Sequence, residues 1–74
     1  MPDQLSTAVS AEVRRLLAER GMSGRELSRL TGIPQKTVAD KLSDRSSFNL
    51  DELTQVGDVL QVTVTDLLSW AQRS

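Results

Sequence analysis

The sequence predicts an all-α domain of five helices. Three observations lead to this prediction. Apolar residues recur at helical spacing along the 74-residue chain, three helix starts share one capping pattern, and the longest alternation in period two is the short run 62–65. This length suits one compact domain, so we expect residues 1–74 to form a single domain. Because the chain ends directly after the fifth predicted helix, we expect no effector or autocleavage domain.

The first predicted helix covers residues 7–20. Its apolar residues recur at the spacing that lines one face of a helix: Val9, Val13, Leu16 and Leu17. Gly21 follows the last turn, where glycine commonly ends a helix. Arg14, Arg15 and Glu19 lie off this stripe. We interpret Arg14, Arg15 and Arg20 as a solvated helix face rather than as ligand contacts.

Three further predicted helices begin with the same sequence pattern: 23–31, 50–60 and 64–72. An apolar residue precedes a capping side chain, an acid follows three positions later, and leucine comes next, which combines a capping box with a hydrophobic staple. The cap and acid pairs are Ser23 with Glu26, Asn49 with Glu52, and Thr63 with Asp66. Only the first is a strict Ser-x-x-Glu box, and the other two are looser variants.

Residues 23–42 predict a helix, a tight turn and a second helix, which spans 35–43. Gly32 stands where the chain needs a left-handed turn, and Ser28 is small where the two helices cross. The residues expected to face inward are Leu27, Leu30, Ile33, Val38 and Leu42.

Charge is distributed unevenly along the chain, although the formal net charge is −1. Residues 14–45 hold eight basic and four acidic side chains, a balance of +4, whereas residues 46–74 hold one and four, a balance of −3. Residues 1–13 add −2. The helix pair therefore lies in the positive part, and the local field, not the total, decides whether a surface attracts nucleic acid.

The composition excludes several classes of function. Without cysteine or histidine the chain has no disulfide, no thiolate nucleophile, no cysteine-ligated zinc, and neither the commonest general base nor the commonest metal ligand. The adjacent acids Asp51 and Glu52 belong to the first turn of a capped helix rather than to a catalytic pair. We expect no enzyme activity, metal, cofactor or small-molecule ligand. No signal peptide or membrane-spanning stretch is recognisable, so a cytoplasmic protein is expected.

The segments Met22–Leu42 (MSGRELSRLTGIPQKTVADKL) and Phe48–Leu68 (FNLDELTQVGDVLQVTVTDLL) resemble the Cro and lambda-repressor helix-turn-helix family, of XRE type, over about residues 9–69. The resemblance implies a compact five-helix lambda-repressor-like domain whose helices 2 and 3 form the helix-turn-helix. It implies a sequence-specific regulator of transcription, such as a phage repressor or Cro protein. As a homodimer it would bind a pseudo-palindromic operator in double-stranded DNA at the bacterial nucleoid and occlude a promoter.

The resemblance also assigns base-reading roles to the third helix. Gln35 occupies the position from which the family often contacts adenine, and Lys36 the next position, where it could bond guanine, bind phosphate or be solvated. Thr37 and Ala39 could touch a thymine methyl. Asp40 either accepts a hydrogen bond from cytosine or orients Lys36 from the next turn.

Phosphate contacts are expected on both sides of this helix, at the start of the second helix and in the segment that follows the third. They are Ser23, Gly24, Arg25, Ser43, Arg45, Ser46, Ser47 and Asn49. Three positions depart from the family. Gly24 replaces a glutamine that braces the first recognition residue, and Asp40 puts a negative charge on the groove face. Gln61 replaces a glycine at a helix end, where a strained or less sharp cap is expected.

Trp70 has two interpretations. It either covers the open edge of a small core or anchors a two-fold dimer contact with Leu67 and Ala71. A rival function is a protein-interaction module that keeps the helix pair and binds through its acidic C-terminal part. A second rival is an antitoxin component that binds both DNA and a protein toxin.

Overall fold

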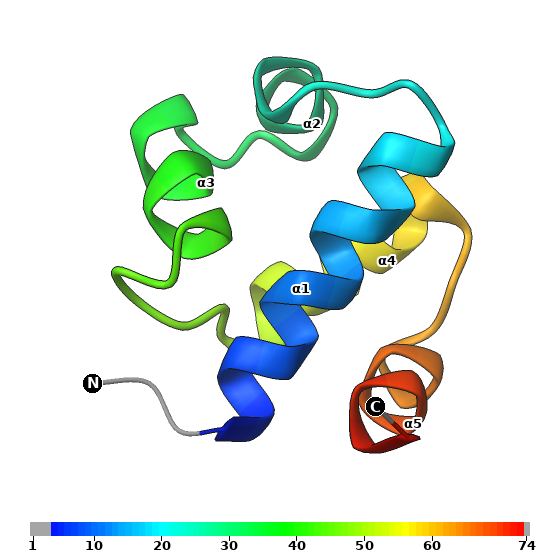
Figure 1. Ribbon diagram of the computed structural model, residues 1–74. Helices are drawn as coiled ribbons and strands as arrows, with labels where there is room; N and C mark the ends of the chain where they lie inside the picture. Colours follow the sequence, from blue (N-terminus) through cyan, green and yellow to red (C-terminus); the bar gives the residue numbers. More distant parts are fainter. Residues whose placement is uncertain (1–3, 74) are drawn as a thin grey trace.

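The computed structural model describes residues 4–73, which form five α-helices joined by short loops (Figure 1). The helices are α1 (Gln4–Glu19), α2 (Gly24–Thr31), α3 (Gln35–Leu42), α4 (Leu50–Leu60) and α5 (Val64–Arg73). Within residues 4–73 there is no strand, so the predicted all-α class is confirmed. The helix ends lie within one residue of the prediction, except that α1 begins three residues earlier.

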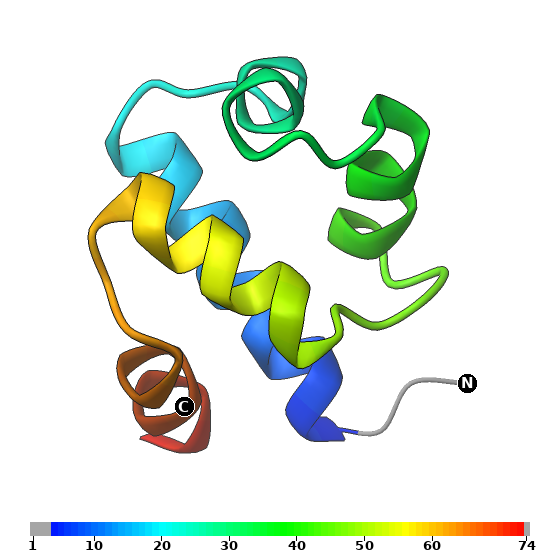
Figure 2. The same cartoon turned by 180° about the vertical axis from the view of Figure 1, so that it is seen from behind.

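Helix α1 runs through the middle of the molecule, with α3 on one side and α5 on the other (Figures 1 and 2). It packs against both of these helices, whereas α2 packs against α3 and α4, and α4 packs against α5. The helix-turn-helix pair is therefore supported from two directions, by α1 behind α3 and by α4 behind α2.

All five helices contribute to one hydrophobic core. The four apolar residues predicted for the inner face of α1 are all buried, as are Leu27, Ile33 and Val38 of the helix pair. Leu42 is half-buried and packs against the core, as its predicted inward position requires. The remaining buried apolar residues come from α4 and α5: Leu53, Val56, Leu60, Leu67 and Ala71.

The predicted inward position of Leu30 is wrong, because 46% of this residue is exposed. The side of α2 that faces the protein carries the buried Leu27 and the half-buried Gly24, Ser28 and Thr31. At about 100° per residue, Leu30 lies more than a quarter turn away from the centre of this stripe. The inner face of α2 is thus made mostly of small and polar residues, and its second leucine points to solvent.

The predicted capping boxes of α4 and α5 form with both of their hydrogen bonds. The Glu52 N–H donates to Asn49 Oδ1 at 2.7 Å, and the Asn49 N–H donates to Glu52 Oε1 at 2.9 Å. In the same way Thr63 Oγ1 accepts from the Asp66 N–H at 2.9 Å, and Asp66 Oδ2 accepts from the Thr63 N–H at 3.2 Å. The two variants that look looser in sequence therefore satisfy the orphan amides of their helix starts.

Helix α4 ends in the strained cap that the sequence predicts. Gln61 adopts a left-handed conformation, with φ 62° and ψ 42°, and its N–H donates to the Gly57 carbonyl. A side chain with a Cβ is unfavourable in this region of φ and ψ, where glycine is the usual residue.

Candidate nucleic-acid interface

The turn between α2 and α3 is short and is held by its own hydrogen bonds. Gly32 has φ 80°, which confirms the predicted left-handed turn, and its N–H donates to the Ser28 carbonyl at 2.9 Å. The Ser28 hydroxyl in turn donates to the Ile33 carbonyl at 2.5 Å, while the Ile33 side chain is buried. These bonds fix where Gln35 begins the next helix, and thus the direction of α3.

The start of α2 presents Ser23 and Arg25 to solvent. Ser23 Oγ accepts the Glu26 N–H at 3.1 Å, so this hydroxyl caps the helix. Gly24 is half-buried, and a Cβ at this position would lie 3.5 Å from the Leu42 side chain. The first turn of α2 is therefore packed against α3, with the Arg25 side chain left outside.

The outer face of α3 carries the residues predicted to read bases. The buried Val38 marks the side of the helix that faces the core. Of the five candidates, three are exposed and two are half-buried: Gln35, Lys36 and Ala39, then Thr37 and Asp40. Among residues 4–73 Asp40 forms no ion pair with Lys36, so the structure does not show the orienting contact between these two side chains. Gln35 and Lys36 thus project from the first turn of α3 into solvent.

Four of the basic side chains in the positive segment contact other groups of the protein. Arg14 pairs with Asp44, and Lys41 pairs with Glu52 at 3.0 Å. Arg20 donates to the Leu60 carbonyl at 2.9 Å. Arg15 pairs with two carboxylates of its own helix, those of Glu12 and Glu19. Arg14, Arg15 and Arg20 are exposed, as the solvated-face prediction requires. The contacts of Arg14 and Arg20 with α3 and α4 were not predicted, because these partners lie far away in sequence.

Arg20 donates to carbonyls and forms no ion pair among residues 4–73. The other cations that have no ion-pair partner within the described part of the chain lie on a different set of elements. Arg25 and Arg29 belong to α2, Lys36 to α3, Arg45 to the loop after α3, and Arg73 to α5. All five are exposed. Four of them therefore surround the helix-turn-helix, and we call Arg25, Arg29, Lys36 and Arg45 the cationic set. Sequence reasoning missed Arg29, one turn after Arg25, although its i,i+4 spacing from Arg25 is a usable signal.

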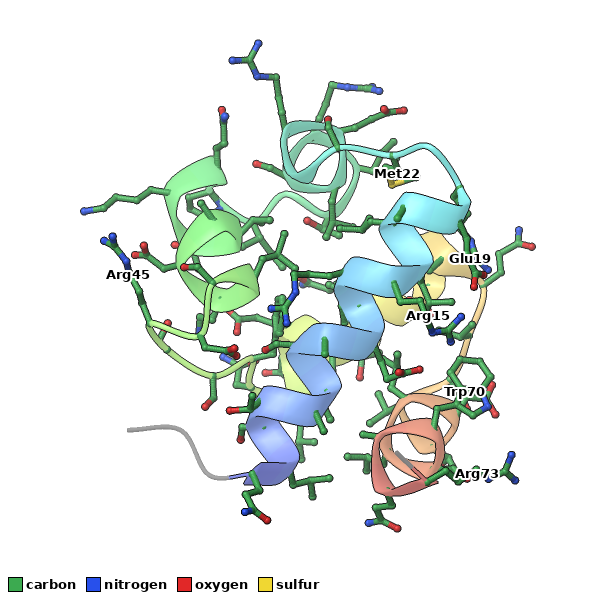
Figure 3. The ribbon with its side chains drawn as sticks, in the orientation of Figure 1. Arg15, Glu19, Met22, Arg45, Trp70 and Arg73 are labelled. Atoms are coloured by element: carbon green, nitrogen blue, oxygen red, sulfur yellow. The ribbon has the colours of Figure 1, made fainter. Side chains whose placement is uncertain are left out.

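Figure 3 shows how far the two ends of this charge distribution are separated. Arg45 extends outward beside the end of α3, whereas Arg73 lies on α5 at the opposite side of the molecule (Figure 3). Acidic side chains of α4, Asp51 and Asp58, are exposed as well. The exposed cations of the cationic set therefore lie on and beside α2 and α3, within the segment whose charge balance is positive.

The C-terminal end of α3 is completed by side chains from α1. The Ser10 hydroxyl donates to the Lys41 carbonyl at 3.1 Å, and the Arg14 guanidinium donates to the Leu42 carbonyl. Ser10 is only 1% exposed and is the buried polar residue of the core region. The carbonyls in the last turn of a helix have no hydrogen-bond donor within that helix. Side chains of α1 supply these donors to α3.

The loop from α3 to α4 holds the second group of predicted phosphate contacts. Ser43, Arg45, Ser46 and Asn49 are exposed, and Ser47 is half-buried. Within this loop the Ser47 carbonyl accepts from Lys41, the Ser43 hydroxyl donates to the Asp40 carbonyl at 3.2 Å, and Asn49 caps α4. The predicted contacts therefore lie on two sides of α3, at the start of α2 and in this loop.

The predicted dimer contact requires a correction. Leu67 is fully buried and Ala71 is 5% exposed, so both side chains belong to the core of the single chain and offer no surface to a partner. Trp70 is half-buried and packs against the core, as the first interpretation of this residue predicts. The Arg15 guanidinium lies 5.8 Å from the centre of the Trp70 ring, close enough for a cation–π interaction (Figure 3). A hydrogen bond from Arg15 to Glu12 holds the pKa of this guanidinium above its ordinary value.

An apolar groove that the sequence reasoning missed lies between α1, α4 and α5. Its volume is about 150 Å³, and its rim includes Leu50, which is 69% exposed, and Leu5, which is 40% exposed. Phe48 and Leu68 line it as well. The sequence signal for this groove is Leu50, an apolar residue at the first position of the capped helix α4. It is not needed for the core there, because Phe48 and Leu53 already pack at this end of the helix.

Between residues 4 and 73, no three side chains of the metal-ligating types come together. None of the helices in the same range has the length and apolar character needed to cross a bilayer.

The sequence was also compared with known proteins. Residues 12–72 match the model of one family, the Cro/C1-type HTH DNA-binding domain. No curated protein and no solved structure gives a significant match. The matched range covers most of the chain, from the middle of α1 to the last turn of α5, and includes the turn at Gly32 and the whole of α3. The chain therefore belongs to the Cro/C1-type helix-turn-helix DNA-binding domain family.

Proposed function

We propose that this protein is a sequence-specific regulator of transcription that reads the major groove of double-stranded DNA with α3. The observation that carries the proposal is the exposed first turn of α3, with Gln35 and Lys36, placed among the cationic set. A helix of this width fits the major groove, where each base pair presents a distinct pattern of donors and acceptors. The cations beside it supply the attraction to phosphates that holds the helix in register.

The proposed roles follow the exposure of the side chains. Gln35 and Lys36 read base edges, Gln35 by a bidentate bond to adenine and Lys36 by bonding guanine. Ala39 and the half-buried Thr37 contact thymine methyls. The Asp40 carboxylate accepts a hydrogen bond from cytosine. Phosphates are held on one side by Arg25 and the first amides of α2, and on the other by Arg45 with the loop serines.

The proposal extends to assembly and regulation. We propose that the chain is one such domain, that it works as a homodimer on a pseudo-palindromic operator, and that a bound dimer occludes a promoter at the bacterial nucleoid, as phage repressors and Cro proteins do. Two half-sites about 34–36 Å apart, one helical turn, would then be protected. Among the described residues, Leu50 is 69% exposed and Trp70 is half-buried. For a contact between two copies, the apolar surface at Leu50 is therefore more accessible than that of Trp70.

Selection of bound duplexes from a random pool tests this function. An enriched sequence with two-fold symmetry supports a specific dimeric reader, whereas failure to bind any duplex even at low salt refutes DNA binding. That outcome would favour the alternative, a protein-interaction module or an antitoxin component that uses this fold to bind a protein partner.

Single substitutions then separate base reading from backbone contact. We expect Gln35→Ala and Lys36→Ala to cost about 1–3 kcal/mol on the selected duplex and to relax specificity at one base pair. If either substitution weakens binding equally on all sequences, the residue meets only phosphate. Arg73→Ala is the matched control, because it removes an exposed cation from α5, on the far side of the molecule (Figure 3). It should leave the salt dependence of binding unchanged.

A further inference from the structure

Lys41 belongs to the recognition helix, yet its ammonium is turned inward. Its Nζ donates to the Ser47 carbonyl at 2.7 Å and lies 3.0 Å from Glu52 Oε1. Only 15% of the Lys41 side chain and 16% of the Glu52 side chain are exposed. The ammonium thus has a carboxylate and a carbonyl as partners and is shielded from solvent, unlike the ammonium of Lys36.

The same residue is tied to a second element through its backbone. The Ser10 hydroxyl of α1 donates to the Lys41 carbonyl at 3.1 Å. Glu52 Oε1, which forms the ion pair with Lys41, also accepts the Asn49 N–H at 2.9 Å. Lys41 therefore joins the end of α3 to α1 on one side, and to the following loop and the cap of α4 on the other.

The contact with Ser47 closes a short stretch of chain, because Lys41 and Ser47 are six residues apart. Between them the backbone turns through Asp44, which has φ 67°, and the Arg45 N–H donates to the Asp40 carbonyl at 2.9 Å. The exposed Arg45 side chain is presented from inside this closed stretch. Its position consequently depends on the two ends that Lys41 holds together.

We propose that Lys41 is a positioning residue of the DNA-binding surface, whose ammonium fixes the loop so that Arg45 meets the DNA backbone. This inference rests on the proposed function. Lys41 does not itself bind phosphate, since doing so would require its ammonium to leave Glu52 and the Ser47 carbonyl. An ion pair that is partly removed from water is costly to break from one side, because the remaining charge is left without a partner.

Two substitutions separate positioning from direct contact. Lys41→Met keeps most of the aliphatic stem and removes the charge. Glu52→Gln removes the partner's charge, while a glutamine oxygen can still accept the Asn49 N–H, because glutamine also completes a capping box. Affinity is measured for a short fluorescein-labelled duplex of mixed sequence by anisotropy over a range of salt concentrations. Far-UV circular dichroism confirms that each variant is folded at the temperature used.

We expect each variant to bind about fivefold more weakly than the wild type at 0.15 M salt, which is roughly the counterion-release contribution of one phosphate contact. In an Arg45→Ala background neither substitution should lower the affinity further, and the salt slope should stay at the value set by Arg45→Ala alone. A direct phosphate contact predicts the opposite pattern. Lys41→Met would then reduce affinity and slope by about one more contact in that background, and Glu52→Gln would strengthen binding by freeing the lysine.

Either result of that kind overturns the inference, as does unchanged binding of both single variants. If Lys41→Met fails to fold, the sign of the Glu52→Gln effect decides alone, since weaker binding supports positioning and unchanged or stronger binding refutes it. Failure of the wild-type protein to bind the duplex at low salt is a different result, which refutes the proposed function itself.

Discussion

Replacing Gln61 by glycine should stabilise the protein. Gln61 ends α4 with φ 62° and ψ 42°, is exposed, and uses its backbone N–H for the bond to Gly57. A left-handed conformation costs a residue with a Cβ about 1–2 kcal/mol, and glycine avoids this cost. Against this gain stands the larger entropy that glycine loses on folding, about 0.5–1 kcal/mol.

The net gain expected for Gln61→Gly is therefore about 0.5–1 kcal/mol, which corresponds to a rise of about 2–8 °C in Tm for a domain of this size. Thermal and urea unfolding followed by circular dichroism measure it. Gly32→Ala is the matched control: Gly32 has φ 80° and no heavy atom within 4 Å of the place a Cβ would take, so this substitution should destabilise by strain alone. A Tm for Gln61→Gly equal to or below that of the wild type would refute the reasoning, and DNA affinity should be the same for Gln61→Gly and wild type.

Three further predictions concern packing. Gly57→Ala would place a Cβ 2.4 Å from the Val62 carbonyl oxygen, so the turn must shift, and a loss of about 1–3 kcal/mol should appear in urea unfolding. Leu67→Ala should cost about 2–5 kcal/mol, because this side chain is fully buried, whereas Leu30→Ala at its exposed position should stay within about 0.5 kcal/mol; similar losses in both would contradict the assigned burial. Gly24→Ala should gain about 0.4–1 kcal/mol, because a Cβ there meets its nearest neighbour at 3.5 Å, an ordinary contact. A lowered Tm for Gly24→Ala would show that α2 and α3 are packed too tightly there.

Local rules predict much of this fold because its signals are local. Each capping box requires side chains three residues apart, and the left-handed turns at Gly32 and Gln61 follow directly where helical patterns stop. The spacing of Leu30 from Leu27 wrongly predicts a core position, because a helix of eight residues has few inward positions. In α2 a glycine, a serine and a threonine occupy inward positions beside Leu27. A pattern of apolar residues alone does not predict this.

Such local rules predict less of the candidate site. Tertiary contacts decide whether a cation has a partner within the protein. Arg14 and Arg20 reach carbonyls 28 and 40 residues further along the chain. Lys41 and Lys36 look alike in sequence, yet one ammonium is enclosed and the other is exposed. The sequence places the helix pair within the positive segment, while the distinction between cations that contact other groups of the protein and cations that do not came only from the structure.

The bonds that α1 sends to the ends of other helices bear on how the domain opens. Ser10 and Arg14 complete α3, and Arg20 completes α4, so undocking α1 would leave carbonyls at both helix ends without these partners. Helices this short are marginal on their own in water. Protection of the α3 amides against hydrogen exchange should therefore be lost together with that of α1, in one cooperative unit. The recognition helix would then be either fully formed or absent, with no separately folded helix pair left to bind DNA.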